Sequence, residues 1–148
     1  FLPYRLSILS NLVSQGLAQI YQQRYRLSVP EWRAMAVLGR YPGLTASQLG
    51  ERTVMDKVTV SRAVNSLLKR KLLQRMTDSS DRRKRPLQVS DGAGQKLLRD
   101  LIPLAMEYQA ALRACLSDRE QIMFESLLHQ LLDGARQLSL QGTPDRRT

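Results

Sequence analysis

Apolar residues recur at helical spacing near both ends of the chain. Over about residues 4–26 they fall at i, i+3, i+4, i+7, i+8 and i+11, and a second stripe of this kind runs over about residues 118–140. The first stripe consists of Leu9, Leu12, Val13, Gly16, Leu17 and Ile20, and the second of Phe124, Leu127, Leu128, Leu131, Leu132, Ala135 and Leu138. Each pattern predicts a long amphipathic helix with one face that needs a partner.

Helix-capping residues divide the middle of the chain into shorter elements. Ser28 and Thr45 each begin a capping box, with Glu31 and Gln48 three residues further on, and Asp56 precedes another helical pattern. These signals predict three helices, over about residues 29–40, 46–53 and 57–71. The third helix turns Val60, Val64, Leu67 and Leu68 inward and leaves Thr59, Ser61, Arg62, Asn65 and Lys69 outward.

A β-hairpin is predicted to follow these helices. Residues 72–76 and 86–89 form short extended runs on either side of a basic tip, and Pro86 stands where a strand begins and a missing N–H is tolerated. A helical run over residues 91–116 comes next, in which Pro103 is expected to kink or split the helix. The predicted fold is mainly α with a small β-hairpin wing, arranged as a winged helix-turn-helix with helices at both ends.

The apolar stripes at the two ends predict a homodimer. A winged-helix core of about 70 residues cannot easily cover both stripes, whereas the same pair of helices in a second copy could bury them. A two-fold dimer would also bring two reading helices to successive major grooves, roughly 34 Å apart. The alternative is a monomer whose terminal helices cap the core. The expected organisation is an N-terminal dimerisation helix (1–27), a winged helix-turn-helix DNA-binding core (28–99) and C-terminal dimerisation helices (100–148).

Positive charge is concentrated on the predicted reading helix and wing. Residues 57–85 contain ten Lys and Arg residues and only two Asp residues, so this segment carries +8 of the net charge of +10. A solvated surface would scatter its charge, whereas a face that binds a polyanion concentrates it. The segment therefore predicts binding to double-stranded DNA, with a solubility surface rich in Lys and Arg as the alternative.

Other classes of function find little support in the sequence. There is no run of about 18 apolar residues and no signal-peptide pattern, and the cytoplasm is the expected location. With Cys115 as the single cysteine, we expect neither an intrachain disulfide nor a multi-cysteine metal site. The sequence has no Gly-rich phosphate loop and no motif for a nucleophile with its base, so neither an enzyme nor a cofactor is expected. A winged helix used for protein–protein docking remains an alternative, although it would not need such a charge.

A specific combination of motifs lies in the middle of the chain. Asp56-Lys57 and Thr59-Val60-Ser61-Arg62 begin the third helix, and Asp81-Arg82-Arg83 stands in the hairpin tip. Together with Leu49-Gly50-Glu51-Arg52, this pattern resembles the MarR family of bacterial transcription regulators. The resemblance implies a dimer that binds pseudo-palindromic promoter DNA, usually as a repressor. In many members, a small phenolic or aromatic-acid ligand releases the DNA.

The resemblance and the helical pattern together indicate which residues contact DNA. The predicted DNA-binding residues are Thr45, Lys57, Thr59, Ser61, Arg62, Asn65, Lys69, Asp81, Arg82, Arg83, Lys84 and Arg85. By resemblance, Asp81 would orient Arg83, and Arg82 with Arg83 would reach the minor groove. Arg62 either reads a guanine edge or contacts a phosphate, and Asn65 either reads adenine or contacts nothing. The two threonine and serine hydroxyls at the start of the reading helix are expected near phosphates, and the last two basic residues of the tip are expected to attract the backbone generally.

Two features depart from the family pattern. The family often has Gly after the recognition helix, where this chain has Lys71, so either a strained left-handed cap or a slightly longer helix is expected. Gly92 and Gly94 follow the second strand at a spacing that does not match the usual single glycine. These departures concern the ends of the helix and wing, and no proposed DNA contact.

Several other side chains have two interpretations. Trp32 is expected to anchor the core rather than to stack on a ligand. Cys115 is expected to be an inert buried thiol on the apolar side of a helix. Three tyrosines either line an effector pocket or pack in the ordinary way: Tyr25, Tyr41 and Tyr108.

Overall fold

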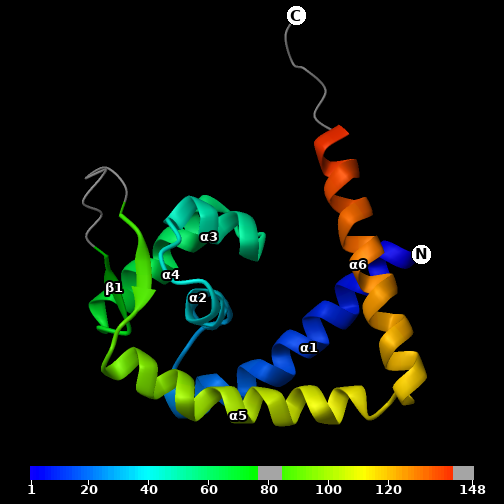
Figure 1. Ribbon diagram of the computed structural model, residues 1–148, viewed down its shortest axis with the longest axis horizontal. Helices are drawn as coiled ribbons and strands as arrows, with labels where there is room; N and C mark the ends of the chain where they lie inside the picture. Colours follow the sequence, from blue (N-terminus) through cyan, green and yellow to red (C-terminus); the bar gives the residue numbers. More distant parts are fainter. Residues whose placement is uncertain (77–84, 142–148) are drawn as a thin grey trace, which may run out of the picture. The chain divides into compact units, whose positions relative to one another are not determined.

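The computed structural model describes residues 1–76 and 85–141. Its elements are α1 (Leu2–Tyr25), α2 (Val29–Arg40), α3 (Ala46–Thr53), α4 (Lys57–Lys69), β1 (Leu73–Arg75), β2 (Leu87–Val89), α5 (Ala93–Arg113) and α6 (Asp118–Gln141) (Figure 1). The chain forms two compact units, residues 1–107 and 108–148, and α5 continues from the first into the second. The prediction of a mainly α fold with a small β-hairpin is confirmed.

The capping boxes fix where the central helices begin. Ser28 accepts from the backbone N–H of Glu31, whose carboxylate accepts from the Ser28 N–H at 2.7 Å. Thr45 and Gln48 repeat this exchange at α3, where the Thr45 N–H donates to Gln48 Oε1 at 2.9 Å. Each box satisfies backbone donors that the first helical turn leaves without a partner. The bounds predicted for α2 and α3 are confirmed.

Helix α4 ends two residues earlier than predicted, and the reason lies at Lys71. Its backbone is left-handed, with φ of 58°, and the N–H of Leu72 reaches back to the carbonyl of Leu67 at 2.9 Å. This turn satisfies carbonyls at the helix end and sends the chain directly into β1. Of the two expected alternatives, the strained left-handed cap is therefore the one observed.

The hairpin is antiparallel and turns one face into the core. Its strands pair Leu73 with Val89 and Arg75 with Leu87, and an isolated bridge joins Leu87 to Leu44 in front of α3. Leu73, Leu87 and Val89 are buried, as the two-residue period of a strand requires. The hairpin is thus held against the helical part of the first unit, next to α4.

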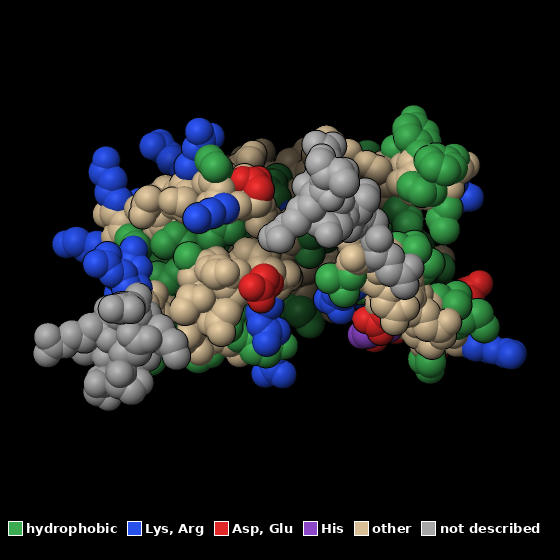
Figure 2. All heavy atoms as spheres, turned by 90° about the horizontal axis from the view of Figure 1, so that it is seen from above, with side chains coloured by type: hydrophobic (Ala, Val, Ile, Leu, Met, Phe, Trp, Pro, Cys, Tyr) green, Lys and Arg blue, Asp and Glu red, His purple; other side chains and the backbone are tan. Residues whose placement is uncertain are grey.

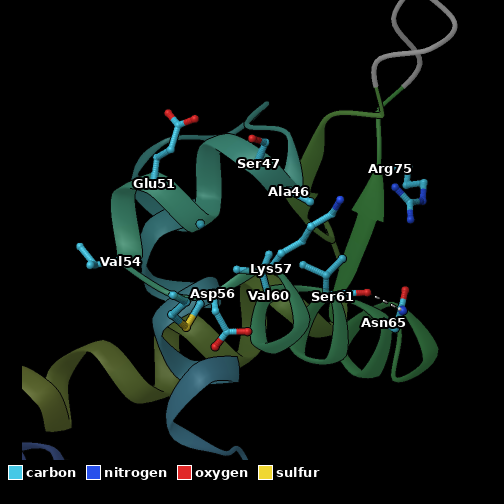
Figure 3. A pocket seen from close by; sticks show the side chains of 13 residues that line it. Ala46, Ser47, Glu51, Val54, Asp56, Lys57, Val60, Ser61, Asn65 and Arg75 are labelled. Carbon is cyan, nitrogen blue, oxygen red and sulfur yellow. Dashed lines mark hydrogen bonds between the residues drawn. The ribbon is translucent and has the colours of Figure 1, made fainter. Parts of the chain in front are cut away.

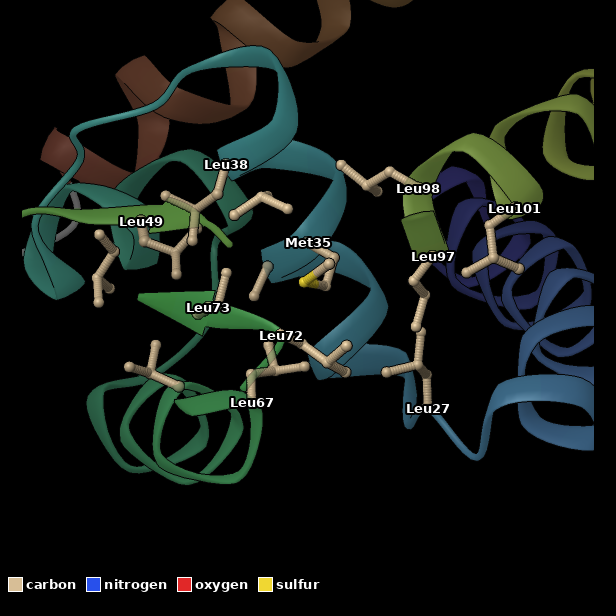
Figure 4. Packing of buried hydrophobic residues seen from close by; sticks show 14 of the residues in the cluster. Leu27, Met35, Leu38, Leu49, Leu67, Leu72, Leu73, Leu97, Leu98 and Leu101 are labelled. Carbon is tan, nitrogen blue, oxygen red and sulfur yellow. The ribbon is translucent and has the colours of Figure 1, made fainter. Parts of the chain in front are cut away.

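The core of the first unit gathers around α2. Figure 4 shows side chains of α2, α3, α4, the hairpin and α5 converging there. The fully buried large residues are Leu27, Met35, Leu38, Leu49, Leu67, Leu87 and Leu101. Trp32 packs against this core and stacks on Tyr21 with 5.4 Å between ring centroids, so it is a core anchor as predicted.

The packing around Gly94 explains one of the two glycines that depart from the family pattern. A Cβ atom there would lie 2.2 Å from the carbonyl oxygen of Leu72, whereas one at Gly92 would meet nothing within 4 Å. The Gly94 N–H also donates to Ser90 Oγ, and Ser90 Oγ donates to the carbonyl of Lys71. Gly94 therefore allows the start of α5 to approach the end of α4 closely.

The region of α5 departs from prediction in two ways. Pro103 was expected to kink or split the helix, and α5 runs through it without being split. Cys115 was expected to be buried and is exposed; it lies beyond the end of α5 at Arg113, in a turn in which its N–H donates to the carbonyl of Leu112. The residue therefore lies outside the helix in which the sequence placed it.

Both terminal helices carry exposed apolar side chains. In the N-terminal half of α1, Leu9 and Leu12 are exposed, whereas Ala18 and Tyr21 nearer its end are buried. No residue of α6 whose side chain is described is buried, and its exposed apolar residues are Ile122, Met123, Phe124, Leu127, Leu128, Leu131, Leu132, Leu138 and Leu140. Among the described residues, no helix is long and apolar enough to cross a membrane.

Candidate nucleic-acid interface

Helix α4 has one face in the core and one face in solvent. Val60, Ala63, Val64 and Leu67 are buried against α2, α3 and the hairpin. Five residues at i, i+3, i+4, i+7 and i+11 form the opposite face, all of them exposed, and we call them the reading stripe: Val58, Ser61, Arg62, Asn65 and Lys69. Four of the five are predicted DNA-binding residues. Val58 is the member that sequence reasoning missed, although the same helical period points to it.

The start of α4 is capped by Asp56. Its carboxylate accepts from the Thr59 N–H at 2.9 Å and from the Thr59 hydroxyl. The hydrogen bonds from the side chain and backbone of Thr59 hold the pKa of Asp56 below its usual value. Thr59 was predicted to contact a phosphate, but its single hydroxyl proton is engaged here. Such a contact would require that proton to leave Asp56.

The hydroxyl groups of Thr45 and Ser61 remain able to donate a hydrogen bond. Thr45 caps α3 by accepting from Gln48, so its hydroxyl proton is not used in that bond. Ser61 accepts from the Asn65 amide at 3.5 Å and likewise keeps its proton (Figure 3). Both side chains can therefore donate to an anionic oxygen.

A hollow separates α3 from α4 on the same side of the molecule. It is lined by residues of both helices and of the turn between them, with Arg75 of β1 at its margin (Figure 3). Lys57 and Ser61 line it from α4, and Ala46 and Ser47 from the start of α3. The first turns of α3 and α4 and Arg75 of the hairpin therefore border the same hollow.

Exposed cations surround this surface. Figure 2 shows Lys and Arg side chains gathered over the part of the first unit that carries α3, α4 and the hairpin. The exposed Lys and Arg residues of α4 and the hairpin region include Lys57, Arg62, Lys69, Arg75 and Arg85. Within the described part of the chain, none of the ion pairs uses these five side chains. Their charge is therefore directed to solvent or to a polyanion.

Four predicted wing residues lie outside the described residues: Asp81, Arg82, Arg83 and Lys84. The structure places Arg85 at the foot of the hairpin, one residue before Pro86. The expected pairing of Asp81 with Arg83 and the reach of the wing stay predictions.

A cluster around a buried carboxylate ties α4 to α1 and α2. Glu31 of α2 accepts from the Ser66 hydroxyl of α4, and Arg70, just beyond α4, lies 3.9 Å from it. Arg70 also donates to the carbonyl oxygens of Tyr25 and Arg26, at 2.7 and 3.2 Å. The C-terminal end of α4 is thereby fixed to the end of α1 and the start of α2. The sequence showed Glu31 only as a capping residue.

Burial and hydrogen bonding act in opposite directions on Glu31. Burial alone would raise its pKa, but the hydrogen bonds from Ser28 and Ser66, together with the Arg70 charge, outweigh burial and lower it. The carboxylate is consequently ionised at neutral pH, and its partners offset the cost of its burial.

None of the three tyrosines lines the hollow between α3 and α4 or the one between α1 and α2. Tyr41 lies against Arg52, whose guanidinium carbon is 4.2 Å from the ring centroid, and Tyr25 packs at the edge of the core. Tyr108 belongs to the other compact unit. A separate polar hollow between α1 and α2 is lined by Ser14 and Arg33, which hydrogen-bond to each other at 3.4 Å. Among the described residues, no group of His, Cys, Asp and Glu could hold a metal ion.

Comparisons with known proteins match both the sequence and the fold. A family model described as the MarR family matches residues 27–84. A MarR family transcriptional regulator from Silicibacter pomeroyi is 30% identical, with a TM-score of 0.81, over 91% of this chain and 89% of that protein. A comparison with curated protein sequences gives no significant match.

Two further solved structures share the fold at lower identity. A MarR/EmrR family transcriptional regulator from Acinetobacter sp. ADP1 has a TM-score of 0.84 at 23% identity, over 91% of this chain and 94% of that one. The S. aureus MepR–DNA complex has a TM-score of 0.79 at 21% identity, over 90% and 98%. In that complex the similar fold is bound to DNA.

Proposed function

Because this chain belongs to the MarR family of transcriptional regulators, we propose that it binds duplex DNA sequence-specifically, with α4 in the major groove. The chain is a regulator and not an enzyme. The observation that carries the proposal is the reading stripe: one solvent-facing row of side chains on α4, mostly polar or basic, beside further exposed cations. A reading helix of this kind contacts base edges through its N-terminal residues, while the flanking cations contact phosphates. A winged helix that docks on proteins would have no need for this charge.

We propose that the active species is a homodimer on a pseudo-palindromic operator, and that it acts as a repressor. The support is the exposed apolar residues of α1 and α6, which a second copy would cover. In this organisation residues 1–27 and 100–148 provide the dimer contacts, and residues 28–99 bind DNA. The hairpin, with Arg82 and Arg83 at its tip, is proposed to enter the adjacent minor groove.

We also propose that a small aromatic acid controls release of the DNA. The polar hollow between α1 and α2 offers Arg33 as a partner for a carboxylate. A thermal-shift screen of aromatic acids, repeated with Arg33→Ala, tests this part of the proposal. Stabilisation by an acid that the variant loses is expected, and equal stabilisation of both proteins would contradict the assignment to this hollow.

The DNA-binding role is tested by charge removal on the reading stripe. Duplexes are first selected from a random-sequence library by the wild-type protein. Arg62→Ala should weaken binding to the selected duplex and lower the salt dependence by about one ion per subunit, because one phosphate or base contact is lost. Arg99→Ala removes the same charge from an exposed position on α5 and should change neither quantity. Equal effects of the two variants would contradict the proposed face.

A further inference from the structure

The reading stripe contains one apolar residue. Val58 is the second residue of α4, and 58% of it is exposed. The residues one turn further on, Ser61 and Arg62, are polar and basic, as are Asn65 and Lys69 beyond them. A single valine therefore stands at the front of a row that is otherwise built for hydrogen bonds and charge.

The fold does not require a valine at this position. Val60, Val64 and Leu67 supply the buried face of α4, and Val58 is absent from the core and its fringe. Valine is also a weaker helix former than alanine at an exposed helical position. Isolated exposed apolar side chains are common, so exposure alone carries no meaning. What distinguishes Val58 is its place on the face that approaches DNA.

The major groove offers one apolar group to such a side chain. Of the groups on the base edges there, only the C5 methyl of thymine is apolar, and small aliphatic side chains contact it. The N-terminal residues of a reading helix are the ones that reach the base edges. Lys57, the residue before Val58, is exposed and can hold a phosphate close by.

We propose that Val58 reads the 5-methyl group of a pyrimidine in each half-site. This inference rests on the proposed function, since it requires α4 to lie in the major groove. Thymine is the ordinary source of the methyl group, and 5-methylcytosine presents the same chemistry. Burial of one methyl group corresponds to about a fourfold gain in affinity per half-site.

The experiment removes the methyl group from the DNA and the valine from the protein separately. In the duplex selected from the random library, each thymine is replaced in turn by uracil, which lacks only that methyl. The wild-type protein should lose about fourfold in affinity at one position per half-site. Val58→Ala should bind the thymine duplex more weakly and show no further loss with uracil at that position. If uracil has no effect at any position and the affinity of the wild-type protein rises only when a cytosine is replaced by 5-methylcytosine, Val58 reads the methyl group of methylated DNA.

Two variants separate the methyl contact of Val58 from a general loss of DNA binding. Ser61→Ala lies on the same stripe and should weaken binding while keeping the full uracil penalty. Val58→Thr keeps one methyl of the side chain and should keep part of the penalty. A penalty that persists unchanged in Val58→Ala would overturn the inference, since DNA shape or another residue would then sense the methyl.

The same binding measurements distinguish a failure of the Val58 contact from a failure of sequence-specific DNA binding. If wild-type protein prefers the selected duplex over a scrambled one but no methyl group on any pyrimidine affects its affinity, the role of Val58 is overturned and DNA binding stands. If it shows no preference between the selected and scrambled duplexes, sequence-specific binding itself fails.

Discussion

At the scale of single residues, backbone strain and close approach shape the end of the reading helix. Lys71 stands in the left-handed region, which costs an L-residue roughly 1–2 kcal/mol. Gly94 packs against the same turn, where a Cβ would collide with the Leu72 carbonyl. The two positions together let α4 stop abruptly and α5 start beside it. The glycine that the family often has after the recognition helix would relieve the strain at Lys71.

Replacing Lys71 with glycine should therefore stabilise the protein. We expect Lys71→Gly to raise the free energy of unfolding by roughly 0.5–1 kcal/mol, because relief of left-handed strain exceeds the added entropy of the unfolded chain. Urea unfolding followed by circular dichroism measures the change. Lys69→Gly, in the last turn of α4, loses the same type of side chain without relieving strain, and should destabilise by about 1 kcal/mol. A loss of stability in both variants would contradict this account of the cap.

At the scale of elements, a buried carboxylate holds α4 in place. Glu31 joins α2 to Ser66 of α4, and Arg70 joins the end of α4 to the last carbonyls of α1. The reading helix is thus fixed at its C-terminal end, while its N-terminal turns remain free to meet DNA. Movement of α1 would be transmitted to α4 through Arg70.

The Glu31 cluster predicts a pH dependence of stability. The pKa of Glu31 is lower in the folded protein than its ordinary value of 4.5. Its contribution to stability is therefore present above about pH 4.5 and is lost as the pH falls through the lowered value. In Glu31→Gln this part of the dependence should disappear, whereas Glu51→Gln, an exposed position on α3, should keep it. Urea titrations at several pH values between about 3 and about 7 provide the test. Parallel curves for wild type and Glu31→Gln would count against the cluster.

Local signals made much of this element structure predictable. The capping boxes at Ser28 and Thr45 correctly predicted where α2 and α3 begin, because a cap depends on residues three apart. Cys115 was misplaced because the helical period cannot show where α5 tightens into a turn. The contacts of Glu31 with Ser66 and Arg70 could not be predicted, since they join residues that are far apart in the sequence. The helical period alone also places Val58 on the outward face of α4, although its side chain is apolar.

At the scale of the whole molecule, charge and apolar surface occupy different elements. The segment 57–85 carries most of the net charge of +10, while the exposed apolar residues lie mainly on α1 and α6. Such a separation suits a protein that contacts DNA with one part and a second copy of itself with another. A substitution on α6 should then affect dimer formation without unfolding the winged helix.

Dimer formation is tested on α6. Leu131 is 44% exposed, and Leu131→Arg would place an unpaired charge in the proposed contact between copies. We expect a monomer with a folded winged helix and at least a tenfold loss of operator affinity, on the order of the coupling between two half-sites. Analytical ultracentrifugation and circular dichroism measure the two properties. Gln130→Arg adds the same charge next to this position and should stay dimeric. A monomeric Leu131→Arg that still bound the full operator tightly would contradict the dimer proposal.

The basic face around α4 is proposed to bind duplex DNA in a sequence-dependent way. The most direct measurement is fluorescence anisotropy of wild-type protein with the selected and scrambled duplexes across a series of salt concentrations. We expect the affinity for both duplexes to fall steeply as salt rises, because phosphate contacts release counterions, and we expect the selected duplex to stay preferred. Failure to bind either duplex even in dilute buffer would contradict it.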